Sequence, residues 1–198
     1  MLVKCGKYSI PIVFQDKFTV IIHKPWGLAS QKGANISVPD ILGQFFLYQK
    51  THSSSSRDVV LPYESVTKGA YVGLVHRLDR CVSGLMIIAK NSRAARHLTD
   101  AIKTQCAIEK TYLALVYGHM VSKEWKKYDN SMVNEKGKEL PVSLSAKCLG
   151  HFSNHTSLVK VQLITGRKRQ IRAQLSYLGH PILGDFKFGA PSTTNGLK

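Results

Sequence analysis

The stretch HRLDRCVSGLMIIAK, His76 to Lys90, places a single acid between two arginines and then becomes apolar. The residues before it predict a strand over 73–78, and GLMIIAK is typical of a buried strand. Asp79 therefore lies where a strand runs into a glycine-containing loop, and Arg77 and Arg80 favour its ionised form. On this pattern alone Asp79 is either a structural ion-pair partner or a carboxylate held for catalysis, as nucleophile, general base or electrostatic stabiliser.

The segments on both sides of this stretch predict more strands than helices. A β-branched run over 18–22 precedes a turn, and Ser37 is a candidate cap for a helix over 37–50. The serine-rich segment 51–58 predicts a mobile polar loop. Further along, the patterns predict helices over 91–105 and 169–179, strands over 110–118 and 157–166, and a polar hairpin over 124–140 that turns near 135–137. Because no regular βαβ rhythm occurs, we expect an α+β fold, one domain over 1–198 with a mixed, largely antiparallel sheet flanked by helices.

The charge of the chain is its most informative bulk property. Its 198 residues contain 28 Lys and Arg against 12 Asp and Glu, a formal net charge of +16. So large a surplus favours a polyanionic partner, most often nucleic acid. A ribosomal or scaffolding protein that binds RNA without altering it has the same property. No apolar run approaches the roughly 18 residues of a membrane span, and no segment combines a basic face with a strongly apolar one.

The four cysteines are scattered singly, at Cys5, Cys81, Cys106 and Cys148. Without a CxxC pair or histidines at ligand spacing, we expect no metal site, and free thiols indicate a reducing compartment. The first residues show no secretory signal. We therefore expect a cytoplasmic protein, with mitochondria or the nucleus as alternatives in a eukaryote.

Two further segments contain residues of chemical interest. TGRKRQIR, Thr165 to Arg172, carries four cations after a glycine turn, and both helix N-termini and arginine forks suit phosphate oxygens. The alternative is a solvated basic face. Tyr112 lies in the alternating segment KTYLALVYG, where a tyrosine ordinarily packs in the core.

Taken together and in this order, these segments resemble the RluA-type RNA pseudouridine synthases. HRLDRCVSGLMIIAK resembles the family segment HRLDRxTSGLLLxAK, and KTYLALVYG resembles KxYxAxVxG. TGRKRQIRAQLSYLGHPILGD resembles TGRxHQIRxHLxxxGHPIxGD, and IIHKPWGLASQKG resembles the early NKPxGLxVHxG turn. The matched stretches run from about Phe18 to Gly189. The chain stops at FGAPSTTNGLK, so we expect the family's final LHAxxLxFxHP strand, like an N-terminal S4 module, to be missing.

The resemblance implies isomerisation of uridine to pseudouridine in RNA, without a cofactor. It implies a catalytic set in one RNA cleft: Asp79 acts on the sugar of a flipped nucleotide, Tyr112 stacks on the base, and Arg172 pairs with the aspartate. It also implies that Arg77 helps to displace the target nucleotide. The other expected RNA contacts are His76, Arg80, Arg167, Lys168 and Arg169.

Some positions differ from the family pattern. Val82 replaces a threonine, His23 an asparagine, and Arg169 and Gln174 the two histidines of HQIRxH. None of these is in the catalytic set, so the same reaction is expected. The expected partner is transfer, ribosomal or messenger RNA, bound by a monomeric enzyme without membrane attachment. The alternatives are a catalytically silent RNA-binding or ribosome-assembly factor on the same fold, and a generic basic nucleic-acid-binding protein.

Overall fold

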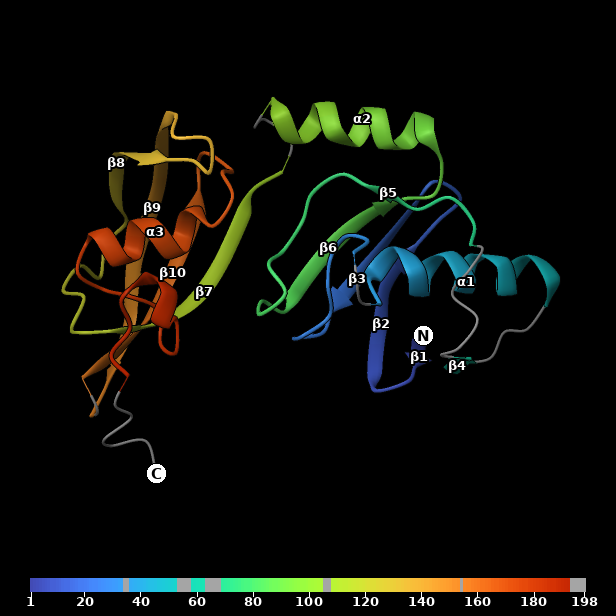
Figure 1. Cartoon of the computed structure of the whole chain (residues 1–198), viewed down its shortest axis with the longest axis horizontal. Coiled ribbons are helices and arrows are strands. Elements are labelled where there is room, and N and C mark those ends of the chain that lie inside the picture. The colour runs from blue at the N-terminus through green and yellow to red at the C-terminus, as the bar shows by residue number, and fades with distance from the viewer. Residues whose placement is uncertain (34–35, 53–57, 63–68, 105–107, 154, 193–198) are drawn as a thin grey trace. The chain divides into compact units, whose positions relative to one another are not determined.

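The computed structural model describes residues 1–33, 36–52, 58–62, 69–104, 108–153 and 155–192, which form two compact units, Met1–Ala107 and Ile108–Lys198. Each unit contains one sheet and at least one helix (Figure 1). The predicted α+β class with mixed, largely antiparallel strand pairing is confirmed, and the strands belong to two sheets. The predicted loop over 51–58 lies mostly outside the described residues, since only its two ends, Thr51 and Asp58, are included.

The sheet of the first unit has the strand order β4-β1-β2-β3-β6-β5. Neighbouring strands in this sheet pair antiparallel, except that β1 and β4 run parallel. The strands are β1 (Leu2–Cys5), β2 (Tyr8–Gln15), β3 (Thr19–Lys24), β4 (Asp58–Leu61), β5 (Gly73–Leu74) and β6 (Gly84–Ala89). Alternating residues of β3 and β6, such as Ile22 and Ile88, are fully buried, so this pair of strands forms the centre of the first core.

Helix α1 (Val38–Thr51) begins at the predicted cap, Ser37. The Ser37 N–H donates to Asp40 Oδ2 at 3.0 Å, and a proline in the first turn adds no unsatisfied donor. Ile41, Leu42 and Phe45 are fully buried at helical spacing. The helix lies across the strands of its unit (Figure 1), and Gln49 accepts a hydrogen bond from Gln15 Nε2 at the end of β2.

Helix α2 (Ser92–Lys103) begins where Asn91 Oδ1 accepts the N–H of Ala94 at 2.8 Å. Its predicted inward residues, Ala94, Leu98, Ala101 and Ile102, are only half-buried, and none of Ser92–Lys103 is fully buried. The helix contacts β5 and β6, the last two strands at one end of the sheet. At the end of a sheet a helix meets less apolar surface than it would over the central strands.

The strand predicted over 73–78 is much shorter in the structure. Only Gly73 and Leu74 pair with β6, opposite Ala89 and Ile88. At the next position the N–H of Ile87 donates to the side chain of His76, at 3.0 Å to Nε2. A side-chain acceptor therefore takes the donor that a longer strand would use, and the backbone is released into the loop that contains Asp79.

The second unit has an antiparallel sheet in the order β7-β10-β9-β8, with β7 (Lys110–Tyr117), β8 (Lys126–Val133), β9 (Glu139–Phe152) and β10 (Thr156–Leu163). The predicted turn of the β8–β9 hairpin is confirmed: Asn134 N–H donates to Lys138 O at 2.9 Å, and Gly137 has φ +74°. Helix α3 (Gln170–Tyr177) packs on the sheet through Leu175 (Figure 1), and a short 3₁₀ turn, Phe186–Phe188, follows.

Candidate active site

The loop that carries Asp79 is fixed to the segment that follows β3. Ser30, which is buried, donates its hydroxyl to the carbonyl of Leu78 at 2.6 Å and accepts the N–H of Leu78 at 3.2 Å. After Leu78, the N–H of Val82 donates to the carbonyl of Asp79 at 3.0 Å and closes a turn. The Asp79 side chain is half-buried on this braced loop. The backbone that carries the carboxylate is therefore fixed on both sides of Asp79.

Lys24 supports the same loop from inside the first core. It continues the buried face of β3 after Val20 and Ile22, and it is 0% exposed. Its ammonium donates to the carbonyls of Pro25 at 2.9 Å, Leu28 at 2.8 Å and Arg80 at 3.4 Å. Burial lowers the pKa of Lys24 to about 8, against the opposing effects of Cys81 and Asp79.

The two arginines beside Asp79 bond to the 25–31 segment. Arg80 Nε donates to the carbonyl of Gly27 at 2.8 Å, and the Gly27 N–H donates to the carbonyl of Arg80 at 2.9 Å. Arg77 Nη1 donates to Gln31 Oε1 at 2.8 Å. Both guanidinium groups thus place positive charge beside the Asp79 loop while they connect it to its neighbour. His76, also an expected RNA contact, is half-buried and accepts the N–H of Ile87.

Tyr112 belongs to the second unit, on β7. It is half-buried on the face of the sheet that carries Ala114 and Val116, and it packs against the core of this unit. The next residue, Leu113, points to the opposite face and is 66% exposed. The ring of Tyr112 therefore has one side supported by the core, which is what a stacking platform for a base needs.

Arg172 on α3 forms a two-point ion pair with Asp185. Nε lies 2.6 Å from Oδ2 and Nη2 lies 2.7 Å from Oδ1, and the two side chains are 19% and 9% exposed. The guanidinium carbon also lies 4.7 Å from the centre of the Phe188 ring. The Asp185 carboxylate and the Phe188 ring together fix the plane of the guanidinium. Asp185 is the last residue of the GHPILGD motif, and no role was predicted for it from the sequence.

Buried glutamines hold the turn before α3 in place. Gln170 Oε1 accepts from the hydroxyl of Thr165 and from the N–H of Arg167, both at 2.9 Å, and its Nε2 donates to Ser143 O at 3.0 Å. Gln170 Nε2 also donates to Gln174 Oε1 at 2.8 Å, and both glutamines are 2% exposed. The departure from the family pattern at Gln174 is therefore part of the internal support of α3.

Two further cations of TGRKRQIR pair with an acid from the β8–β9 hairpin. Lys168 Nζ lies 2.6 Å and Arg169 Nη1 3.4 Å from the same oxygen of Glu135. Hydrogen bonding from Lys168, with the charges of Lys168, Arg169 and Lys187, lowers the pKa of Glu135. Arg169 has φ +60°, a left-handed conformation at the cap of α3, and Arg167 is exposed. This patch lies on the surface, where ion pairs are weak and easily exchanged.

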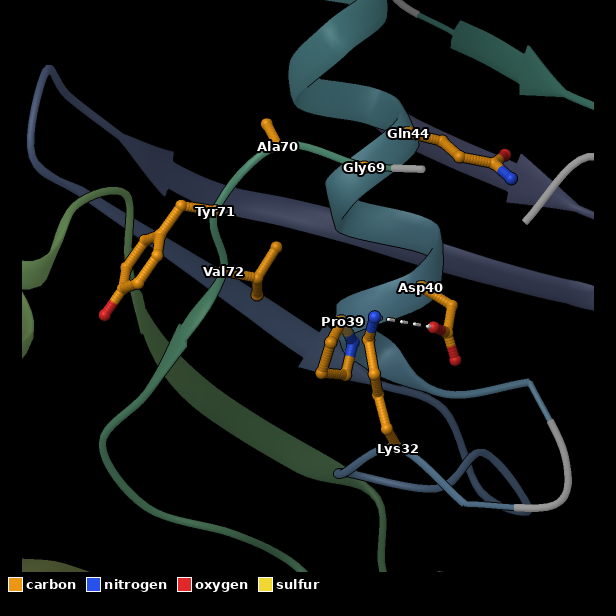
Figure 2. A pocket seen from close by; sticks show the side chains of 8 residues that line it. All are labelled: Lys32, Pro39, Asp40, Gln44, Gly69, Ala70, Tyr71 and Val72. Carbon is orange, nitrogen blue, oxygen red and sulfur yellow. Dashed lines mark ion pairs between the residues drawn. The ribbon is translucent and has the colours of Figure 1, made fainter. Parts of the chain in front are cut away.

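A pocket of ≈ 230 Å³ lies in the first unit between α1 and residues 69–72. Figure 2 shows the ammonium of Lys32 directed at Asp40, and the ion pair measures 3.7 Å. Gly43 and Gly69 approach so closely that a Cβ on Gly69 would lie 2.9 Å from the Gly43 Cα. None of the expected site residues lines this pocket, so we do not assign it to the active site.

Within the described parts of the chain, no three His, Cys, Asp or Glu side chains are arranged to hold a metal ion. Cys5, Cys81 and Cys148 are free thiols there, and Cys106 lies outside the described residues. Among the same residues, no helix combines the length and apolar character needed to cross a membrane.

Comparisons with known proteins show which family the sequence matches. A family model described as RNA pseudouridylate synthase matches residues 18–177, a range that contains Asp79, Tyr112 and Arg172. A "Ribosomal large subunit pseudouridine synthase C" of Rickettsia bellii is 33% identical over 189 residues, which are 90% of this chain and 56% of the relative. An "Uncharacterized RNA pseudouridine synthase" of Mycoplasma capricolum is 32% identical over 192 residues, 91% of this chain and 59% of the relative. The chain thus spans somewhat more than half the length of these relatives.

Solved structures support the fold. A chain described as "Human RNA Pseudouridylate Synthase Domain Containing 4" superposes with a TM-score of 0.69 at 24% identity, and the match covers 93% of this chain and 73% of the other. A second, "Human RNA Pseudouridylate Synthase Domain Containing 1", gives a TM-score of 0.67 at 21% identity, over 92% and 71%. At these identities the likeness establishes the architecture.

Proposed function

Since the chain belongs to the RNA pseudouridylate synthase family, we propose that it isomerises uridine to pseudouridine within RNA. The observation that carries this proposal is the bracing of Asp79. Leu78 before it is held by Ser30, and Arg80 after it by Gly27 and Lys24. A structural ion-pair partner does not require its backbone to be fixed on both sides. A carboxylate that must meet one carbon atom of a large substrate does.

The reaction is an exchange of two bonds to C1′ of the ribose. The bond from C1′ to N1 of uracil breaks, the base turns, and a bond from C1′ to C5 forms. The proton on C5 is released and N1 takes up a proton, so the product is an isomer and no co-reactant is consumed. Asp79 either attacks the sugar or assists elimination to a glycal. Both routes need an ionised carboxylate.

The base must leave its stack to be turned, which costs a few kcal/mol. In the proposed mechanism the ring of Tyr112 receives the flipped uracil, and stacking returns about 1–3 kcal/mol. Its half-buried position over Ala114 and Val116 supports this role, because a platform fixed from behind loses little freedom on binding. The phenol is also the group proposed to assist proton removal from C5.

Arg172 is the proposed partner of the Asp79 carboxylate. An arginine has five N–H donors, so the two-point contact with Asp185 is compatible with a second carboxylate. Asp185 and Phe188 orient the guanidinium without touching the substrate, and we assign them a positioning role. Arg172 then compensates the charge of Asp79 and aligns it.

RNA is the proposed partner, bound through the net charge of +16 and through cations such as Arg77, Arg80 and Arg167. Ribosomal RNA of the large subunit is the first substrate to test, because the Rickettsia bellii relative is described as a ribosomal large subunit pseudouridine synthase. A monomeric, cofactor-free enzyme belongs to the same proposal, as does a cytoplasmic location.

The proposal is tested by incubating the protein with ribosomal RNA transcribed in vitro, which contains no pseudouridine, and then separating the nucleosides after digestion. We expect pseudouridine to appear in proportion to time and enzyme. Binding without pseudouridine over ribosomal, transfer and messenger RNA substrates would instead favour a silent RNA-binding factor on this fold.

A further inference from the structure

Trp26 is the most exposed aromatic side chain in the described part of the first unit, at 72%. It lies in the turn Pro25–Gly27, at the variable position of the NKPxGL-like segment. At this exposure the indole adds little to the core, and most of its ring surface is accessible to a ligand.

The backbone on both sides of Trp26 is fixed. The carbonyl of Pro25 accepts a hydrogen bond from the ammonium of Lys24 at 2.9 Å. The carbonyl of Gly27 accepts from Arg80 Nε at 2.8 Å and from the hydroxyl of Tyr8 at 3.3 Å. Gly27 itself has φ +82°, which a residue with a side chain rarely adopts. The turn is therefore rigid, and it holds the indole outside the core.

The same hydrogen bonds bring the turn to the Asp79 loop. Gly27 comes directly after Trp26, and Arg80 comes directly after Asp79. Gly27 and Arg80 donate one hydrogen bond to each other in each direction. Trp26 and Asp79 thus lie on two segments of one unit that are joined by hydrogen bonds at the next residue of each. The positive charge of Arg80 lies at the turn, and the buried ammonium of Lys24 lies behind it.

We propose that Trp26 is a stacking site for an unpaired RNA base next to the target uridine. This inference rests on the proposed function, since it names a contact made by the same substrate. A rigid aromatic ring next to cations suits a nucleotide: the base covers the indole, and the phosphates face Arg80. Flipping one nucleotide leaves its neighbours partly unstacked, and Trp26 offers such a neighbour a new surface.

The chain offers a matched control, because its second tryptophan, Trp125, lies in the other unit between Lys147 and Lys160. In Trp125→Phe, Trp26 is the sole tryptophan; in Trp26→Phe, Trp125 is. We would titrate both variants with a short oligouridylate and with an abasic oligonucleotide of equal length, which carries the phosphates without bases. We expect saturable quenching of Trp26 by the oligouridylate alone. Equal quenching by both oligonucleotides, or quenching only in Trp26→Phe, would overturn the inference.

Trp26→Ala provides the functional readout. We expect it to weaken oligouridylate binding roughly 5- to 100-fold and to leave abasic binding unchanged, with most of the affinity retained in Trp26→Phe. With substrate RNA the loss should appear in KM, and kcat should stay within about threefold because the indole does not touch the reacting atoms. Unchanged binding and KM in an active enzyme would refute the stacking site alone. Base-dependent quenching in a protein that forms no pseudouridine would refute the proposed function alone.

Discussion

Ser30 and Leu78, 48 positions apart in the chain, exchange two hydrogen bonds: the serine hydroxyl donates to the leucine carbonyl and accepts the leucine N–H. Both residues are buried, and Asp79 is the next residue in the chain. One small side chain thus satisfies both backbone groups of the residue that precedes the proposed nucleophile. The buried backbone groups of Leu78 are therefore hydrogen-bonded, as they would be in a helix or a strand, although the loop is neither.

Ser30→Ala tests this bond. The change leaves a buried N–H and a buried carbonyl without their partner, so we expect a loss of about 1–3 kcal/mol in the free energy of unfolding. We also expect a lower kcat, because the Asp79 backbone is released on one side. Urea unfolding and turnover measure the two effects. Ser122→Ala, which removes an exposed serine-to-carbonyl bond at 2.8 Å, should cost less than ~0.5 kcal/mol. Equal effects of the two changes would contradict the bracing role.

Lys24→Met removes the donor that connects three carbonyls, and we expect it to destabilise the fold by about 1–3 kcal/mol. The pH dependence gives a sharper test. Burial lowers the pKa of Lys24 to about 8 from an ordinary 10.5. Between these values the unfolded chain holds a proton that the folded chain has released, so the stability contributed by Lys24 rises with pH.

The measurement is urea unfolding of wild type and Lys24→Met at several pH values from 7 upward. The difference in unfolding free energy should widen in favour of the wild type above about pH 8. Lys32→Met, at a side chain that is 75% exposed, is the control and should show no such trend. A constant or narrowing difference for Lys24→Met would show that the ammonium is not desolvated as described.

Asp185→Asn tests the positioning of Arg172. Replacing one partner of a largely buried ion pair leaves the other uncompensated, with an expected cost of about 3 kcal/mol. If Asp185 orients Arg172 for catalysis, kcat should fall while the Kd for RNA stays nearly constant. Arg172→Lys keeps the positive charge but loses the two-point contact with Asp185, so we again expect a lower kcat and a nearly constant Kd for RNA. A normal kcat in both variants would show that catalysis does not need the two-point ion pair between Arg172 and Asp185.

Glu135→Gln tests the basic patch before α3. The glutamate holds Lys168 and Arg169, and its removal should free both for phosphates. RNA affinity should rise at low salt, and the slope of log Kd against log salt should steepen by roughly 0.7 for each new phosphate contact. Glu139→Gln removes the same charge from the same hairpin, where the partner is the hydroxyl of Ser131. A similar steepening in both variants would mean that only net charge matters.

Some periodic segments of the fold were predictable from the sequence, and others were not. The capped helix at Ser37 and the strand around Tyr112 follow the expected patterns. Strand β2 was not predicted, and it contains Pro11, a residue that is rare in internal strands. Pro11 is tolerated because it pairs with Leu2, at the first residue of β1. The expected strand over 73–78 was too long, because a side chain, His76, replaces its backbone acceptor.

The proposed catalytic residues were predicted through motif resemblance, whereas their supports were not. Ser30, Lys24 and Asp185 act through partners that only the folded chain brings to them. A local signal existed for Lys24, since it continues the alternation of Val20 and Ile22, but a lysine at a core position is usually assigned to a strand end. That Asp79, Tyr112 and Arg172 act on one nucleotide stays a prediction.

The central claim is that the Asp79 carboxylate performs the isomerisation, and the most direct test follows the C5 hydrogen of uridine. RNA substrate transcribed with tritium at uracil C5 would be incubated with wild type, Asp79→Ala and Asp79→Asn, and RNA binding would be measured in parallel. We predict tritium release by the wild type and none by either variant, with RNA binding retained in both. Tritium release that persists in Asp79→Asn would contradict the account.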